Sequence, residues 1–135
     1  MLTVHVGLHK TGSTSIQVAL RRTLKASAVV PREGDSQDDE AVFERLRRVA
    51  GNARVISSES LLGSPFDGYV RAPERARLIA DALAGTPYTL VVYLRPHLQW
   101  FESVYVQYVQ EGGTETPENL GTSIFGSSYV RWHEL

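Results

Sequence analysis

The segment Val4–Leu20, VHVGLHKTGSTSIQVAL, constrains the fold of this chain more than any other segment. It passes from a short apolar run through Gly7 and Gly12 into a segment with helical periodicity. Glycines let the backbone curl so that successive amides point to one place, and the positive end of the following helix faces the same place. The sequence therefore predicts a phosphate- or sulfate-binding loop at the end of a first strand.

The rest of the chain continues this alternation of strands and helices. Three apolar, β-branched segments are predicted as strands, at residues 2–8, 53–58 and 88–94. Apolar residues at helical spacing predict helices at residues 13–26, 38–50, 73–85 and 96–110. Loops or irregular segments are expected at 31–39, 61–73 and 114–126, with the start of a further helix at 127–135. The connection at 61–73 is long for a loop without structure of its own, which is typical of a functional or mobile segment. This order predicts one three-layer α/β domain over residues 1–135, with a mostly parallel sheet.

Each predicted helix has an apolar side that should face the core. The residues expected there are Ile16, Ala19, Leu20 and Leu24; Val42, Phe43, Leu46 and Val49; Ala76, Ile79, Ala80 and Leu83; and Trp100, Phe101, Val104, Tyr105 and Tyr108.

Composition limits the classes of partner. The net charge of −1 gives no broad basic field, so neither nucleic acid nor an anionic membrane is expected as a partner. The chain has no cysteine, which excludes disulfides and thiolate metal sites. No apolar run is long enough to span a bilayer, and no basic region precedes an apolar one at the N-terminus, so a cytoplasmic location is expected.

Charged residues follow all three predicted strands. Lys10, Glu59 and Arg95 stand at the carboxyl ends, where parallel sheets bind their ligands. Ser103 lies about two helical turns beyond Pro96, or roughly 10 Å, so an extended Arg95 can meet it over one phosphate. The three strand ends therefore predict one anion site.

The loop departs from that of a nucleoside triphosphatase. Such a loop reads G-x-x-x-x-G-K-[ST] and needs an acid on a neighbouring strand to hold magnesium. Here Ser13 takes the place of the lysine, and the best later strand ends in Arg95. The first hypothesis is therefore a metal-free site for an anion less charged than the end of a triphosphate. A kinase of the phosphate-loop fold is the second hypothesis.

Two segments together resemble the sulfotransferase family, whose donor is 3′-phosphoadenosine 5′-phosphosulfate. LHKTGSTSIQ is similar to the family's 5′-phosphosulfate loop, and YLRPHLQWFESVYVQ to its 3′-phosphate segment, in which a serine follows an arginine by eight residues. The resemblance implies a P-loop-like sulfotransferase fold, and it is closer to carbohydrate-type and bacterial members. It implies that Lys10 stabilises the leaving group, that Arg95 and Ser103 hold the 3′-phosphate, and that the 5′ cradle consists of Thr11, Gly12, Ser13, Thr14 and Ser15.

The base that activates the acceptor hydroxyl is left between two residues. Glu59 is a candidate because a carboxylate within hydrogen-bond reach can take the proton, and carbohydrate-type members are similar in using a glutamate. His9, beside Lys10, is the rival, although it could line the pocket without taking a proton. The structural alternative for Glu59 is an ion pair with Arg54 or Arg71. No spacing of residues predicts a metal site.

The sequence therefore predicts sulfuryl transfer to a hydroxyl of a carbohydrate or similar small acceptor. Most family members continue well beyond the 3′-phosphate segment, and this chain ends at Leu135, so the C-terminal part of the family fold is expected to be absent. A shortened sheet predicts an open edge and a homodimer. A non-catalytic relic that keeps only the nucleotide cradle is the third hypothesis.

Overall fold

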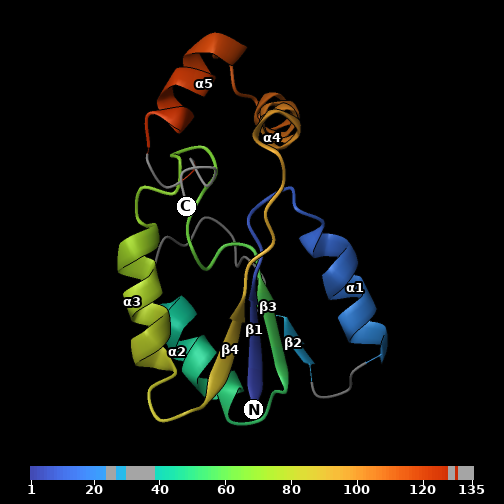
Figure 1. The fold of residues 1–135 in the computed structure, drawn as a ribbon, viewed down its shortest axis with the longest axis vertical. Helices are drawn as coiled ribbons and strands as arrows, with labels where there is room; N and C mark the ends of the chain where they lie inside the picture. The colour runs from blue at the N-terminus through green and yellow to red at the C-terminus, as the bar shows by residue number, and fades with distance from the viewer. Residues whose placement is uncertain (24–26, 30–38, 128–129, 131–135) are drawn as a thin grey trace.

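The computed structural model describes residues 1–23, 27–29, 39–127 and 130, in which helices lie on both faces of a parallel sheet (Figure 1). The predicted α/β class is therefore confirmed. The elements in chain order are β1 (Leu2–Val6), α1 (Ser13–Thr23), β2 (Ser27–Val29), α2 (Asp39–Ala50), β3 (Val55–Ser58), α3 (Ala72–Ala82), β4 (Tyr88–Val91), α4 (His97–Gln110) and α5 (Pro117–Phe125).

The sheet has four strands in the order β2-β3-β1-β4, and all neighbours are parallel. β1 is central, with Val4 opposite Ile56 of β3 on one side and Leu90 of β4 on the other. All carboxyl ends therefore meet at one edge of the sheet, as the sequence predicts for a parallel arrangement.

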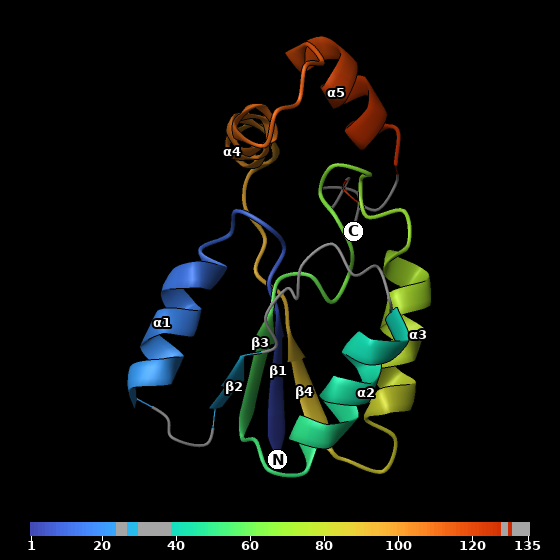
Figure 2. The same ribbon diagram turned by 180° about the vertical axis from the view of Figure 1, so that it is seen from behind.

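The helices are divided between the two faces. α1 lies on one face, whereas α2 and α3 lie together on the other (Figures 1 and 2). The chain thus leaves β1 toward one face and leaves the neighbouring β3 toward the opposite face. Such a divergence opens a crevice at the carboxyl ends of the two strands. α4 and α5 lie beyond this same edge of the sheet.

Two buried clusters hold these parts together. The aliphatic cluster fills the space between the sheet and α2 and α3, and its buried members are Leu2, Val4, Val6, Phe43, Leu46, Ala50, Ile56, Leu61, Ile79, Ala82 and Leu83. The aromatic cluster joins α4 and α5 to the loops at the carboxyl edge. Its buried members are Leu8, Tyr69, Trp100, Val104, Leu120, Ile124 and Val130, with Phe66, Phe101, Tyr105, Tyr108 and Phe125 packed against them.

The strands differ from the prediction in length and number. β1 ends at Val6 rather than residue 8, because Gly7 begins the loop. β4 ends at Val91 rather than residue 94, because its register places Val91 opposite His5 and β1 offers little further chain to pair with. β2 was not predicted; three residues are too few for a periodic pattern, and pairing with β3 defines the strand.

The helices follow the prediction more closely, with one addition. α5 lies where irregular chain was predicted, although Thr116 caps it and Pro117 occupies its first turn. The apolar sides of α2 and α4 are turned inward as predicted, whereas Ala19, Ala76 and Ala80 are exposed. Alanine costs little on either side of a helix, so it predicts a face poorly. Some predictions fall outside the described residues: Leu24, the part of the expected loop at 31–38, and most of the helix expected at 127–135, of which the structure describes Ser127 and Val130.

β4 forms an edge of the sheet and continues into an exposed apolar segment. Leu90 of β4 is 46% exposed, and Val92, Tyr93 and Leu94 after it are similarly exposed. The homodimer stays a prediction, to be checked by light scattering over a range of concentrations.

In the described part of the chain, no helix combines the length and apolarity needed to cross a membrane.

Candidate functional site

A pocket of about 320 Å³ lies at the carboxyl edge of the sheet. It is lined by His9, Lys10, Gly12, Ser13, Thr14, Glu59, Arg95 and Gln107. These residues come from the loop after β1, the start of α1, the end of β3, the segment after β4, and α4. The crevice between the exits of β1 and β3 is thus closed on a third side by the chain that leaves β4.

The loop after β1 depends on its two glycines. A side chain on Gly7 would lie 2.9 Å from Cβ of Ser13, so only glycine allows the loop to close onto the start of α1. Gly12 has a φ of 86°, a conformation that favours glycine. The amide of Ile16 donates to the carbonyl of Gly12 as α1 begins, so the helix does not use the amides just before Ile16. Those amides and the helix dipole suit an anion.

Lys10 stands within this loop in a left-handed conformation, with φ 63°. Such a conformation is uncommon for a residue with a side chain and marks a position that the surrounding structure constrains. In the part of the chain that the structure describes, the Lys10 ammonium forms no ion pair. The pocket therefore has two cations, Lys10 and Arg95, against the single carboxylate of Glu59.

Arg95 joins the loop to α4. Its Nη1 lies 3.2 Å from the backbone oxygen of Lys10 and 3.0 Å from Oγ of Ser103, and it donates to both. The Ser103 hydroxyl donates in turn to the carbonyl of Gln99, at 3.0 Å. Arg95 and Ser103, which are eight residues apart, are thus in direct contact; that they hold one phosphate between them stays a prediction. With its proton engaged, Ser103 here orients the guanidinium of Arg95.

Glu59 faces the loop from the end of β3. Its Oε2 accepts a hydrogen bond of 2.7 Å from the hydroxyl of Ser13. This contact sets the carboxylate beside the first turn of α1, within the same pocket as Lys10. Among the described residues Glu59 has no ion pair, so the alternative pairing with Arg54 or Arg71 is wrong.

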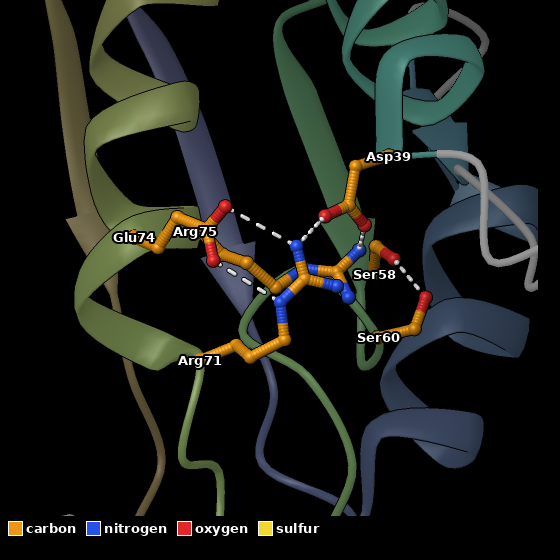
Figure 3. A network of polar contacts seen from close by, with 6 residues as sticks. All are labelled: Asp39, Ser58, Ser60, Arg71, Glu74 and Arg75. Atoms are coloured by element: carbon orange, nitrogen blue, oxygen red, sulfur yellow. Dashed lines mark hydrogen bonds and ion pairs between the residues drawn. The ribbon is translucent and has the colours of Figure 1, made fainter.

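Arg71 belongs to a separate network at the starts of α2 and α3 (Figure 3). Arg71 and Arg75 both bind the carboxylate of Asp39, and Arg71 also binds Glu74. Arg71 donates hydrogen bonds to the carboxylate of Glu74, and this interaction lowers the pKa of Glu74 and raises the pKa of Arg71. The two arginines and two carboxylates neutralise one another. This network fixes the loop between β3 and α3 and leaves Glu59 to the pocket.

His9 is held on both sides of its backbone. Its amide donates to the hydroxyl of Tyr69 at 2.9 Å, and its carbonyl accepts from the indole Nε1 of Trp100, also at 2.9 Å. The Tyr69 hydroxyl additionally lies 3.1 Å from Nδ1 of His9. Tyr69 was not predicted as part of the site. Its position in a long irregular connection was the only signal in the sequence, because the contact with His9 spans 60 residues.

Most of the predicted site residues line the pocket, with three exceptions: Thr11, Ser15 and Ser103. Ser103 adjoins the pocket through its contact with Arg95. The hydroxyl of Thr11 donates to the carbonyl of Leu8 at 2.6 Å, so it stabilises the loop from within. Ser15 is exposed on α1 and does not line the pocket. Gln107 of α4 also lines the pocket, although it was not among the predicted site residues.

In the described part of the chain, no group of three or more His, Asp or Glu residues is arranged to hold a metal ion. Comparisons of the chain with protein-family models, with curated proteins and with solved structures found no match.

Proposed function

We propose that this chain binds 3′-phosphoadenosine 5′-phosphosulfate and transfers its sulfuryl group to a hydroxyl of a carbohydrate or similar small acceptor. The observation that carries the proposal is the bridge made by Arg95. One guanidinium contacts both the loop that carries Lys10 and Ser103 of α4. A ligand with an anionic group at each end, such as this nucleotide, fits two cations that stand in one pocket on different elements.

The size and charge of the pocket are consistent with this donor. A volume of about 320 Å³ is at the lower end of the range for small-molecule sites. We therefore place the phosphosulfate end within the pocket and the 3′-phosphate at the Arg95 side. Two cations against one carboxylate leave an excess of positive charge for the anion.

The proposed roles follow from position. The amides of Gly12, Ser13 and Thr14 cradle the 5′ end, and Lys10 stabilises the charge that grows on the bridging oxygen as its bond to sulfur breaks. Glu59 accepts the proton of the acceptor hydroxyl while that oxygen forms its new bond to sulfur. Ser13, hydrogen-bonded to Glu59, orients the carboxylate within the pocket.

The test is calorimetric titration of 3′-phosphoadenosine 5′-phosphate and of adenosine 5′-phosphate. Arg95→Ala should weaken binding of the first nucleotide by about ten- to a hundredfold, because a charge-assisted hydrogen bond contributes roughly 1.5–3 kcal/mol. The second nucleotide has no 3′-phosphate to lose, so its affinity should change far less. Ser103→Ala should show the same preference at a smaller size, and Lys10→Ala should weaken both nucleotides and abolish transfer.

Arg47→Ala is the matched control, because Arg47 is an exposed arginine of α2 that pairs with Glu44 outside the pocket. It should leave both affinities unchanged. Equal affinity of the wild type for the two nucleotides would overturn the proposal. Binding that requires magnesium would favour the alternative of a phosphate-loop kinase, and binding without any turnover would favour the non-catalytic relic.

A further inference from the structure

Tyr69 reaches the site from the connection between β3 and α3. The residue is only 1% exposed, and its backbone is left-handed with φ 55°. Besides glycines, Lys10 and Tyr69 are the residues of the described chain with a positive φ. The Tyr69 hydroxyl bonds to His9, the neighbour of Lys10. The connection is therefore constrained at the point where it touches the loop.

The hydrogen bonds of Tyr69 determine where its single proton goes. The backbone amide of His9 can only donate, so the phenolic oxygen accepts from it. A buried hydroxyl proton needs an acceptor, and Nδ1 of His9 is the one within reach among the described residues. Burial raises the pKa of Tyr69, so the phenol keeps its proton at any working pH.

Donation from Tyr69 fixes the tautomer of the imidazole. Nδ1 must offer its lone pair to the phenol, and a neutral imidazole with a lone pair on Nδ1 has its proton on Nε2. The backbone of His9 cannot shift to escape this contact, because Trp100 holds its carbonyl. The free choice of tautomer that a solvated histidine has is thereby removed.

We propose that Tyr69 is a positioning residue that holds His9 as a neutral Nε2–H donor. In this state His9 donates a hydrogen bond to an anionic oxygen of the bound sulfuryl donor, and Glu59 is left as the proton acceptor. The inference rests on the proposed function for the identity of the anion. It separates the two candidate bases by chemistry, since a base must present a lone pair and His9 presents a proton.

The tautomer can be read without any ligand. In protein labelled with ¹⁵N-histidine, the His9 signals are identified by their loss in His9→Gln, and nitrogen chemical shifts distinguish protonated from unprotonated ring nitrogens. At pH 7 we expect Nε2 protonated and Nδ1 unprotonated. Tyr69→Phe should convert this single form into a mixture of both tautomers. Tyr105→Phe, which removes a hydroxyl bonded to the carbonyl of Glu115, should leave the His9 signals unchanged.

Substitution of His9 tests the consequence for the site. Glutamine keeps an N–H near the position of Nε2 but cannot act as a base. If His9 is a donor, His9→Ala should weaken nucleotide binding and transfer by about ten- to a hundredfold, and His9→Gln should restore most of that loss. If His9 were the base, both variants would lose transfer by roughly a hundred- to ten thousandfold, which would overturn the inference.

The two proposals can fail separately. A wild-type His9 that carries its proton on Nδ1, or on both nitrogens at pH 7, would overturn the role of Tyr69 and leave the nucleotide proposal standing. A wild type with the expected tautomer that binds neither nucleotide would overturn the proposed function and, with it, the hydrogen bond from His9 to the donor.

Discussion

The aliphatic and aromatic clusters are both buried, but they act on the site in different ways. The aliphatic cluster, with residues such as Val4, Leu46 and Ile56, packs the sheet against α2 and α3 through contacts that have no preferred direction. The aromatic cluster carries polar atoms at its border with the loop after β1. The indole of Trp100 and the hydroxyl of Tyr69 both end on His9.

This difference indicates a division of roles. Apolar burial stabilises the sheet and thereby sets where β1 and β3 end, but it does not define the conformation of a loop. Directed hydrogen bonds from buried aromatic residues do so, because a buried N–H or O–H must find its partner. We therefore expect changes in the first cluster to act on stability, and polar changes in the second to act on binding.

The largest effect is expected for Leu46→Ala in the aliphatic cluster. Leu46 is completely buried, so its truncation should reduce the free energy of unfolding by about 2–5 kcal/mol, measured by urea denaturation. Nucleotide affinity of the protein that remains folded should hold within about twofold, because distant sites are close to independent. The matched control is Leu98→Ala on α4, where leucine is 70% exposed and the cost should stay within about 0.5 kcal/mol.

A loss of affinity in Leu46→Ala as large as its loss of stability would break the proposed division. It would mean that the aliphatic cluster shapes the loop directly. An unfolding free energy equal to that of Leu98→Ala would instead mean that the helix does not pack on the sheet as described.

Trp100→Phe should have an intermediate effect on stability and a measurable one on binding. The variant keeps an aromatic ring but removes the N–H that binds the His9 carbonyl, and an unpaired buried acceptor costs about 1–3 kcal/mol. Because His9 precedes Lys10, we expect the affinity for 3′-phosphoadenosine 5′-phosphate to fall by roughly three- to tenfold. Denaturation and calorimetry on the same samples would measure both effects.

Val104→Ala sharpens this result, since Val104 is buried in the same cluster and has no polar side-chain atom. It should destabilise the protein through lost packing while nucleotide affinity stays within about twofold. If the two variants weakened binding equally, the hydrogen bond of the indole would have no special part in ordering the loop.

The parts of the molecule that the sequence predicts well are those with local causes. Gly7 and Gly12 set the turn after β1, and the strand pattern places Lys10, Glu59 and Arg95 at carboxyl ends once the sheet is parallel. The spacing of Arg95 and Ser103 follows from the rise of a helix. These residues line or adjoin one pocket. The sequence predicts this because each strand that positions them is recognisable from its own local pattern.

The contacts that the sequence did not predict are those between distant segments. Tyr69 lies in a connection without periodicity, and nothing local indicates that it turns back to His9. β2 is likewise defined by its partner strand and not by its three residues. α5 is different, because Thr116 and Pro117 are local start signals that were outweighed by the polar composition of the segment.

The smallest effect is expected at His5, on the sheet face opposite the aliphatic cluster. Its ring is buried, and Nδ1 lies 2.8 Å from the Ser57 hydroxyl. Nε2 has no hydrogen-bond partner among the described residues. Burial lowers the pKa of His5 below its ordinary value of 6.5, so the folded protein keeps this ring neutral where the unfolded chain takes up a proton.

Because the unfolded state then binds more protons, this residue should make the free energy of unfolding fall as the pH drops below about 6.5, and contribute no slope above that pH. The slope from one such group is at most about 1.4 kcal/mol per pH unit.

His5→Asn retains a polar atom near Nδ1 for Ser57 and removes the titration, so urea denaturation at pH 5 to 8 should show the free energy of unfolding declining less steeply toward acid pH than in the wild type. His97→Asn, whose histidine bonds to the carbonyl of Val130, serves as the control for loss of a histidine in α4. An acid decline in His5→Asn as steep as that of the wild type would mean that the pH dependence arises from other groups. The His5 ring would then contribute nothing to the pH dependence of the free energy of unfolding.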